Sequence, residues 1–319
     1  MLTILLFFIG FLVLIKGAGL LVNGAASVAK RLNVTDLVIG LTVVAFGTSM
    51  PEMFVNIFAS IRGNADIAVG NILGSNICNI FLILGIAALV SPLRVRKTTV
   101  WKEIPFSLLA AVVVGILAND RLIDHQSLSI LSRIDGLVLI VFFIIFMIYI
   151  FEIARDFTEE AEIPMAQPGG LVKSLMLIVL GLASLMVGGH WIVGGAVAIA
   201  QSLGVSESLI GLTIVAVGTS LPEMATSIVA AFKKNSDIAV GNIVGSNIFN
   251  IFWILGLSAV IHPLPFKPQI NFDVWMTILA SLILFLVMFL GKKHHLQRLE
   301  GILFLGSYIG YLVFIIRRG

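Results

Sequence analysis

The sequence predicts an all-α polytopic membrane protein with about ten transmembrane helices, arranged as two inverted five-helix repeats. Hydrophobic residues make up 59% of the chain and charged residues only 12%, about half the charged share of a soluble domain. Apolar stretches of bilayer length recur along all 319 residues, and one half of the sequence resembles the other. Because lipid offers the backbone no hydrogen-bonding partner, segments this apolar must be helical.

The ten expected crossings are apolar windows of about 20 residues. The first and sixth are longer than a bilayer requires, so we expect them to be tilted. The first begins without a basic n-region or a small-residue cleavage site, which indicates a retained helix and not a signal peptide. The windows lie at residues 2–29, 37–61, 67–90, 103–118, 135–153, 171–202, 208–231, 238–261, 272–290 and 300–316.

An internal repeat appears when the sequence is shifted by 171 residues. Residues 39–93 then align with 210–264, and roughly 35 of about 55 positions are identical. Each half holds five crossings, an odd number, so the second half must insert upside down relative to the first. We therefore expect a first repeat at 1–151, a cytoplasmic linker at 152–170 and a second repeat at 171–319.

The loop charges predict the orientation. With the N-terminus outside, the inner loops hold 13 lysines and arginines and the outer loops hold 6, and such an excess marks the cytoplasmic side. We expect a multi-pass protein of the cell membrane with both termini outside. Its net charge of +3 fits loops that face lipid headgroups, and no nucleic-acid partner is expected. The inner set is Lys30, Arg31, Arg94, Arg96, Lys97, Lys102, Arg155, Lys173, Lys233, Lys234, Lys292, Lys293 and Arg298.

The second crossing contains the most unusual polar group of the chain, Ala45-Phe46-Gly47-Thr48-Ser49-Met50-Pro51-Glu52. The seventh crossing repeats it as Ala216-Val217-Gly218-Thr219-Ser220-Leu221-Pro222-Glu223. An acid at membrane depth costs roughly 2.5–3.5 kcal/mol and indicates function by default. The proline removes a helix hydrogen bond and the glycine adds backbone freedom, so we expect a broken helix here that exposes carbonyl oxygens beside the hydroxyls and the acid.

The next crossing in each half supplies a second polar surface. Asn71, Ser75 and Asn79 are spaced four apart and so share one helix face. Asn242, Ser246 and Asn250 repeat the spacing. A single amide of this kind can simply form hydrogen bonds between helices. A whole stripe of polar residues opposite a buried acid instead favours a role as cation ligands.

The collected donors are all oxygen atoms, which favours a hard cation. Calcium takes about 6–8 oxygens, and its charge would neutralise Glu52 and Glu223, while sodium could use the same oxygens singly. A cation channel would instead need a continuous pore with a charged ring. An intramembrane serine hydrolase using Ser49 or Ser220 would need a nearby base, which neither half offers. No enzyme activity and no cofactor are expected.

The two motifs resemble the α-repeats of the sodium/calcium exchanger branch of the calcium:cation antiporter superfamily, and the resemblance spans essentially the whole chain. It implies an exchange of sodium for calcium by alternating access, with a ratio of three to one. It also implies that Glu52 and Glu223 share the calcium ion with Thr48 and Thr219. The resemblance further implies flanking sodium sites and residues that border the central site. These positions are Ala45, Ala216, Ser49, Ser220, Ser75, Ser246, Asn79 and Asn250.

Departures from the family pattern leave alternatives open. Potassium-dependent relatives carry Asp at the position of Asn250, and proton-coupled relatives carry an extra acid within the segments 70–76 and 241–247, where this chain has none. These departures count against a proton-coupled or potassium-dependent calcium antiporter, and both stay as alternatives together with a cation channel. The expected partners are calcium, sodium and the bilayer, with a monomer as the functional unit. Asp66 and Asp237, which precede two crossings, are expected to be helix N-caps.

Overall fold

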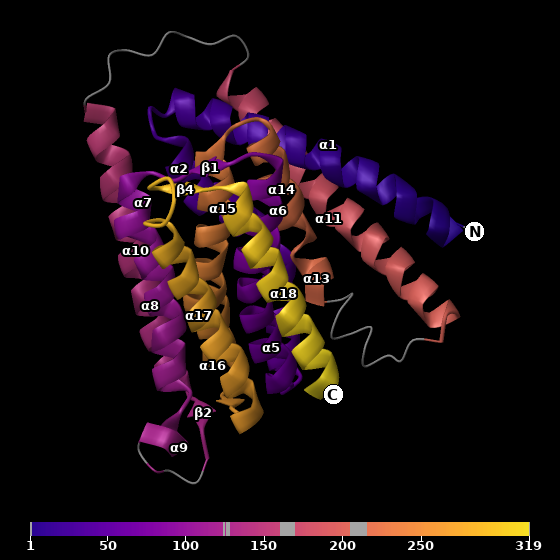
Figure 1. Cartoon of the computed structure of the whole chain (residues 1–319), viewed down its shortest axis with the longest axis vertical. Helices are drawn as coiled ribbons and strands as arrows, with labels where there is room; N and C mark the ends of the chain where they lie inside the picture. The colour runs from indigo at the N-terminus through magenta and orange to yellow at the C-terminus, as the bar shows by residue number, and fades with distance from the viewer. Residues whose placement is uncertain (1, 124, 126–127, 160–169, 205–215, 319) are drawn as a thin grey trace.

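The computed structural model describes residues 2–123, 125, 128–159, 170–204 and 216–318 as a bundle of long helices (Figure 1). Within these residues, eight helices are long and apolar enough to cross a membrane. A ninth span consists of two helices, Asp36–Thr48 and Met50–Ile61, that are bent by 48°. These nine agree with nine of the ten expected crossings. The other crossing, 208–231, is described only from residue 216 onwards, where the apolar helix Leu221–Phe232 lies.

The elements of the first half follow the predicted windows closely, with short π-helical and extended pieces that the windows did not specify. They are α1 (Leu2–Arg31), α2 (Asp36–Ile39), η1 (Gly40–Val44), α3 (Ala45–Thr48), α4 (Met50–Ile61), α5 (Ala65–Ile77), η2 (Cys78–Leu84), α6 (Gly85–Val90), β1 (Leu93–Arg94), α7 (Lys97–Trp101), α8 (Glu103–Leu117), α9 (Asp120–Ile123), β2 (Ile130–Leu131) and α10 (Arg133–Glu159). The helix α10 thus extends into the segment expected as a linker, of which residues 160–169 lie outside the described part.

The second half repeats many of these elements 171 residues later. They are α11 (Leu171–Ser202), α13 (Ala216–Thr219), α14 (Leu221–Phe232), α15 (Ser236–Ile248), η4 (Phe249–Leu255), α16 (Gly256–Ile261), β3 (Leu264–Pro265), η5 (Pro268–Ile270), α17 (Asn271–Val287), β4 (His295–Leu296) and α18 (Arg298–Arg318). The match is residue for residue over α3 to α6 and α13 to α16.

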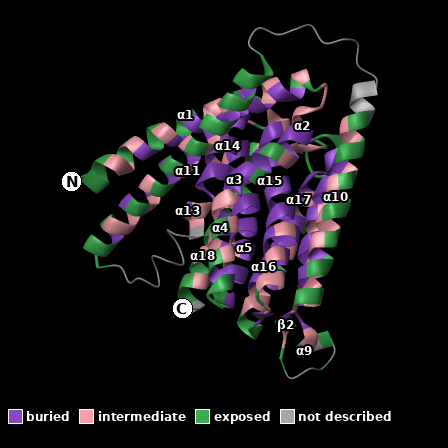
Figure 2. Ribbon diagram, turned by 180° about the vertical axis from the view of Figure 1, so that it is seen from behind, coloured by how far each residue is buried: buried purple, intermediate pink, exposed green. Residues whose placement is uncertain are grey.

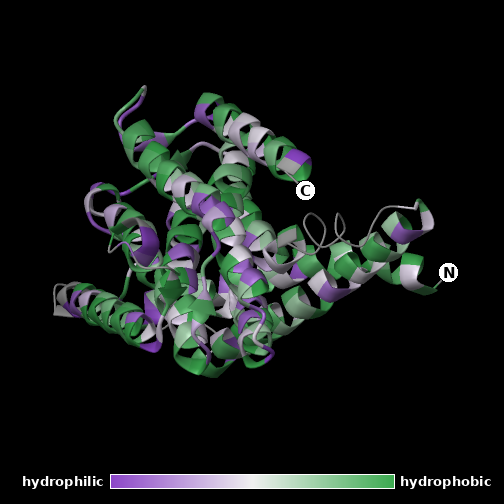
Figure 3. Cartoon of the chain, turned by 90° about the horizontal axis from the view of Figure 1, so that it is seen from below, coloured by the Kyte–Doolittle hydropathy of each residue, from purple (hydrophilic) through white to green (hydrophobic). Residues whose placement is uncertain are grey.

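Two continuous helices form the centre of the bundle, α5–η2–α6 (Ala65–Val90) and α15–η4–α16 (Ser236–Ile261). Their most apolar windows are 78% and 83% buried, against 17% for the peripheral Arg133–Arg155. Figure 2 shows the same layering, with buried residues inside and exposed residues on the outward faces of α1, α10 and α11. Many exposed residues of these three helices are large and hydrophobic, and the view from below shows hydrophobic residues over much of the bundle (Figure 3), as lipid contact requires.

The two central helices run antiparallel, and an ion pair joins them near each end. Arg96, just after α6, binds Asp237 at the start of α15 at 2.6 Å. The equivalent Lys267, just after α16, binds Asp66 at the start of α5 at 2.6 Å. The prediction that the two aspartates are N-caps was wrong. Asn64 and Asn235, two residues earlier, cap the helices by accepting the N–H groups of Ile67 and Ile238, and this leaves each carboxylate free to bind a cation from the other half.

The helices α1 and α11 form an oblique antiparallel pair across the bundle (Figure 1), in keeping with the tilt expected from their length. Glycines spaced seven residues apart bring the two backbones into contact. A Cβ atom at Gly17 would lie 3.0 Å from the carbonyl oxygen of Gly181, and one at Gly181 would lie 2.9 Å from that of Gly17. Small residues allow this close approach where lipid gives helices no hydrophobic drive to associate.

Two short antiparallel strand pairs join the loops, which the all-α prediction did not include. The strand β1 pairs with β4, and β2 pairs with β3, at opposite ends of the bundle (Figure 1). Each pair comprises only two residues per strand, enough to satisfy loop backbone groups beyond the helix ends. The β1–β4 end gathers many of the basic residues that the sequence assigns to the inner side.

Candidate cation site at the centre of the bundle

Both repeated motifs break their helices at the serine, as the prolines predict. The helix α3 ends at Thr48 and α4 begins at Met50, with Ser49 at φ −82°, ψ 7°. In the second motif Ser220 has φ −85°, ψ 7° between α13 and α14. The new helix therefore starts one residue before the proline, and its first turn carries the glutamate. Free N–H groups and the helix dipole favour a negative charge at that position.

The motif glycines have a different role from the backbone freedom that the sequence suggests. Neither has a positive φ, but each lies against α11. A Cβ atom at Gly47 would lie 2.6 Å from Leu182, and one at Gly218 would lie 2.4 Å from Val193. The glycines thus make room for α11, which packs against both broken helices.

The glutamates of the two halves meet in the interior through crossed hydrogen bonds. Glu52 and Glu223 are each 1% exposed. Ser220 donates to Glu52 Oε1 at 3.2 Å, and Ser49 donates to Glu223 Oε1 at 2.9 Å. Each serine lies three residues before the glutamate of its own motif, so the exchange brings both acids to one site. Ser246 also reaches Glu223 Oε1, at 3.5 Å.

Neither carboxylate forms an ion pair with a lysine, arginine or histidine among the residues that the structure describes. The side chains that bind them there are hydroxyls. Removing an ion from water costs several kcal/mol even after relaxation of the surroundings, and a second like charge nearby adds to the cost. Two buried acids of this kind therefore need positive charge from outside the chain when they are ionised.

The threonines of the motifs bind the amide stripe of the opposite half. Thr48 donates to Asn242 Oδ1 at 3.0 Å, and Thr219 lies 3.5 Å from Asn71 Oδ1. The two amide groups are in turn held by residues of α4 and α14. Asn71 donates to Asn56 Oδ1 at 2.7 Å, and Asn242 donates to Ser227 Oγ at 3.0 Å. The helix-face prediction is thus confirmed for the placement of Asn71 and Asn242 opposite the motifs.

The carbonyl oxygen of Ala45 remains within its helix. It accepts the Ser49 N–H at 3.0 Å and is also approached by Ser246 Oγ at 3.5 Å. The break therefore does not release this carbonyl from its helix hydrogen bond, although a carbonyl oxygen has a second lone pair. Its counterpart Ala216 begins α13. Both alanine carbonyl groups stay predicted ligands.

An asparagine cluster across the two central helices contains residues that the sequence reasoning missed. Asn76 and Asn247 each donate to the backbone oxygen of the other, at 3.2 and 3.4 Å. Asn79 donates to Asn247 Oδ1 at 2.9 Å, and Asn250 donates to Asn76 Oδ1 at 3.0 Å. Asn76 lies one position off the predicted stripe, but the repeated sequence Gly-Ser-Asn-Ile at 74–77 and 245–248 was a signal that could have found it.

Several buried oxygen atoms of the two motifs and the two central helices have no hydrogen-bond partner among the described residues. They are Glu52 Oε2, Glu223 Oε2, Asn79 Oδ1, Asn250 Oδ1 and Ser75 Oγ. Buried polar atoms are rarely left unpaired in native proteins. Four of the five can only accept, and carboxylate and amide oxygens are what hard cations such as Ca²⁺ and Na⁺ prefer. The donor set therefore fits the cations that the sequence predicts as substrates.

The two sides of the candidate cation site differ in exposure. Thr48 and Asn242 are fully buried, whereas Thr219 and Asn71 are half-buried. A recess of about 270 Å³ lies beside Thr219, between α11 and the two motif prolines. It is lined by Pro51, Leu185, Met186, Gly189, His190, Val193, Gly218, Thr219 and Pro222. The recess is thus mostly apolar and borders the site at Thr219.

Replacing Asn250 by aspartate is expected to make transport depend on pH. A protonated aspartic acid can still donate to Asn76 Oδ1, but an ionised one faces that oxygen with a third negative charge in the cluster. We expect the relative rates with calcium and sodium to change when the pH is raised, because the added carboxyl group can gain or lose a proton. Calcium flux in vesicles measures this, with Asn64→Asp as a surface control, and a pH profile like the wild type would contradict the placement of Asn250 near the ions.

The comparisons with known proteins agree with this arrangement. The profile described as sodium/calcium exchanger protein matches residues 2–152 and 173–317. The chain is 31% identical to the sodium/calcium exchanger MaX1 of Methanosarcina acetivorans over 97% of each chain, and 36% identical to the inner membrane protein YrbG of Escherichia coli over 97% of this chain and 95% of that one. It is also similar to the solved structure of the sodium-calcium exchanger NCX_Mj soaked with Na⁺ and Sr²⁺, with a TM-score of 0.84, 35% identity and 98% of each chain covered.

Proposed function

The chain belongs to the sodium/calcium exchanger family of membrane antiporters, and from that premise we propose that it exchanges sodium for calcium at the central site by alternating access. The observation that carries the proposal is the pair of buried glutamates, one from each half, without a basic partner among the described residues. The ligands that we propose are Glu52, Glu223, Thr48, Thr219, Ser49, Ser220, Ala45, Ala216, Ser75, Ser246, Asn79 and Asn250.

Two inverted repeats account for the contacts between the halves. Several interactions from the first half to the second have a counterpart in which the partners exchange places, as in the two Ser–Glu bonds, the two Thr–Asn contacts and the two ion pairs. Antiparallel central helices are what inversion in the membrane produces. A pair of similar halves around one site can take two arrangements of similar energy, each open to one side.

The sodium-to-calcium ratio of three to one that we propose is the one that the family resemblance implies, and it makes the exchange electrogenic. One Ca²⁺ brings two ionised glutamates to zero net charge, and three Na⁺ bring them to +1. A full cycle then moves one net charge, which is worth about 2.3 kcal/mol per 100 mV of membrane potential. With both termini outside and an inward sodium gradient, this exchange would drive calcium out of the cell across the cytoplasmic membrane.

The recess beside Thr219 is the proposed route for ions. It lies on the side of the site where Asn71 contacts Thr219. Asn71 belongs to α5, which begins at the end of the bundle where Asp66 binds Lys267. The loop charges predict that this end faces the outside. The side of Thr48 and Asn242, towards the basic loops, is closed. We therefore propose that ions enter this arrangement from the external side.

Calcium-45 uptake into proteoliposomes tests the coupling ion. Vesicles loaded with sodium, potassium or acid are diluted into calcium medium without that gradient ion, with protein-free vesicles as the control. We expect only an outward sodium gradient to drive uptake, at least about tenfold above the other two, because the cluster holds no third acid in the described chain to carry potassium or proton coupling. Uptake driven equally by protons or potassium would contradict sodium coupling, and calcium currents without any gradient ion would indicate a channel.

A further inference from the structure

A second polar feature lies far from the central site, at the end of the bundle where β1 pairs with β4. There a hollow of about 830 Å³ opens between four segments of chain. We call it the basic hollow. It is lined by Asp36, Arg94, Val95, Arg96, Lys97, Lys233, Lys234, Asn235, Ser236, Asp237, Lys293, His294 and His295.

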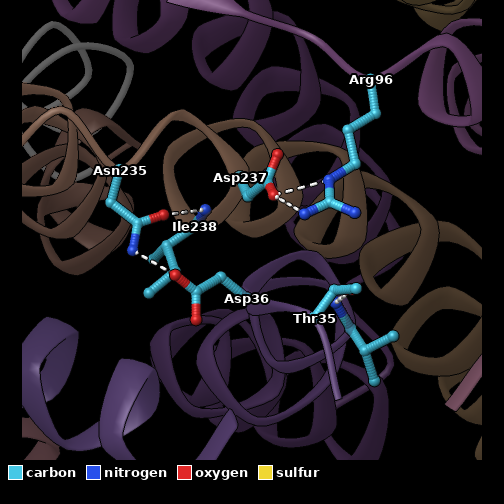
Figure 4. A network of polar contacts seen from close by, with 7 residues as sticks. Thr35, Asp36, Arg96, Asn235, Asp237 and Ile238 are labelled. Carbon is cyan, nitrogen blue, oxygen red and sulfur yellow. Dashed lines mark hydrogen bonds and ion pairs between the residues drawn. The ribbon is translucent and has the colours of Figure 1, made fainter. Parts of the chain in front are cut away.

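The charges of the basic hollow do not balance. Six lysines and arginines face two aspartates. Asp237 is bound by Arg96, and Asp36 accepts a hydrogen bond from Asn235 at 2.7 Å (Figure 4). Lys233 is held by Asn23 Oδ1 at 2.7 Å. Among the described residues, the other four cations have no side-chain hydrogen bond or ion pair; they are Arg94, Lys97, Lys234 and Lys293.

The equivalent positions of the other half show whether the fold itself requires the positive charges of the basic hollow. Arg94, Arg96 and Lys97 correspond to Pro265, Lys267 and Pro268 of the second half. Lys233 and Lys234 correspond to Arg62 and Gly63. Both ends of the bundle keep a cation at the Arg96/Lys267 position, which binds the aspartate of α15 or α5, and at the Lys233/Arg62 position, but Arg94, Lys97 and Lys234 have no cationic counterpart. The shared fold does not require them.

The backbone conformation at Lys234 also indicates that the fold does not require a lysine there. Gly63 and Lys234 occupy equivalent turns with φ of 70° and 60°. Glycine adopts this left-handed conformation freely, whereas a long side chain disfavours it. The chain nevertheless keeps a lysine there, on the rim of the hollow.

Basic loops on one side of a membrane protein can serve only to set its orientation. Orientation depends on how many cations a loop carries, and it does not require cations from three separate segments to surround one cavity. Convergent lysines and arginines with free donors are instead what binds phosphate oxygens. The hollow also lies beyond the ends of the apolar helices α6 and α14, and basic residues next to membrane-spanning helices attract anionic headgroups.

We propose that the basic hollow binds a phosphate-bearing anion, with the headgroup of an anionic phospholipid favoured as its source over a soluble phosphate compound. This goes beyond ion exchange at the central site. Arg94, Lys97, Lys234 and Lys293 supply the contacts, and the Arg96–Asp237 ion pair holds the wall of the hollow between the two halves. A lipid bound here would bridge the loop after α6, the α14–α15 turn and the loop before β4.

Binding of defined lipids to the purified full-length protein tests the proposal. In detergent, native mass spectrometry counts bound phosphatidylglycerol or, as a neutral lipid, phosphatidylcholine. The pocket variant is Lys97→Gln with Lys293→Gln, and the matched control is Arg62→Gln with Arg121→Gln, which removes two exposed cations elsewhere. Insertion direction does not affect the readout in detergent, and thermal unfolding checks that both variants are folded. A second arm titrates pyrophosphate by calorimetry.

Wild-type protein and the control are expected to retain phosphatidylglycerol about 10- to 30-fold more tightly than the pocket variant, from the contribution of two lysines near an anionic headgroup. Phosphatidylcholine should not distinguish the three proteins. If pyrophosphate shows this pattern and phosphatidylglycerol does not, the phosphate site stands and its source is soluble. Equal binding by the pocket variant and the control, or no binding of either probe to wild type, overturns the proposal.

Discussion

Replacing Glu52 or Glu223 by glutamine is expected to abolish sodium-driven calcium uptake, with a loss of at least about 100-fold, or roughly 2.7 kcal/mol. Each substitution removes one of the two buried charges that a divalent cation would neutralise, and it keeps the size of the side chain. Because the two glutamates have equivalent places in crossed hydrogen bonds, both variants should fail to a similar degree. Calcium-45 uptake into sodium-loaded proteoliposomes measures the effect.

A second measurement separates loss of the site from loss of the fold. Calcium should raise the unfolding temperature of the wild-type protein in detergent, because a ligand that binds only the native state stabilises it. Each glutamine variant should lose this calcium-dependent rise. Without calcium, the variants should be at least as stable as wild type, because an uncompensated buried charge has been removed.

Glu103 offers a matched control. It is also a fully buried glutamate, but it lies at the start of α8 and accepts a hydrogen bond from Tyr149, away from the cluster. Glu103→Gln should leave the calcium-dependent rise in unfolding temperature unchanged. If Glu52→Gln and Glu223→Gln behaved like Glu103→Gln in uptake, the two glutamates would not be the cation ligands.

Asn247→Ala is expected to lower the free energy of unfolding by about 2–4 kcal/mol. The amide of Asn247 accepts from Asn79 and donates to the backbone oxygen of Asn76. Its removal leaves a donor and an acceptor unpaired in the centre of the bundle, and each such group costs about 1–3 kcal/mol. Chemical or thermal unfolding of the purified protein in detergent gives the value.

The equivalent Asn76→Ala should have a similar effect, because Asn76 accepts from Asn250 and donates to the backbone oxygen of Asn247. Asn23→Ala is the control, since Asn23 is exposed and accepts from an exposed lysine. Its cost should stay below about 1 kcal/mol. A small effect at both Asn76 and Asn247 would show that the cross-helix cluster contributes little to holding the halves together.

The sequence by itself determined the helical spans that the structure describes, the repeat and the position of both helix breaks. These features follow from local causes. Apolar residues in lipid must be helical, a proline removes a specific backbone donor, and a buried acid at membrane depth stands out by its cost. The convergence of Glu52 and Glu223, with Ser49 and Ser220 beside them, also followed from the repeat, because an odd number of crossings per half predicts inversion.

Only the tertiary structure decided which polar groups bind one another across the 171 residues that separate the halves. Asp66 and Asp237 could cap their own helices as far as local spacing shows, yet they bind cations of the other half. Asn76 and Asn247 fall outside a strict four-residue stripe, but wide π-helical turns begin at Cys78 and Phe249 and alter which side chains share a face. Spacing along one helix fixes a face, whereas the partner of that face depends on how the two halves pack.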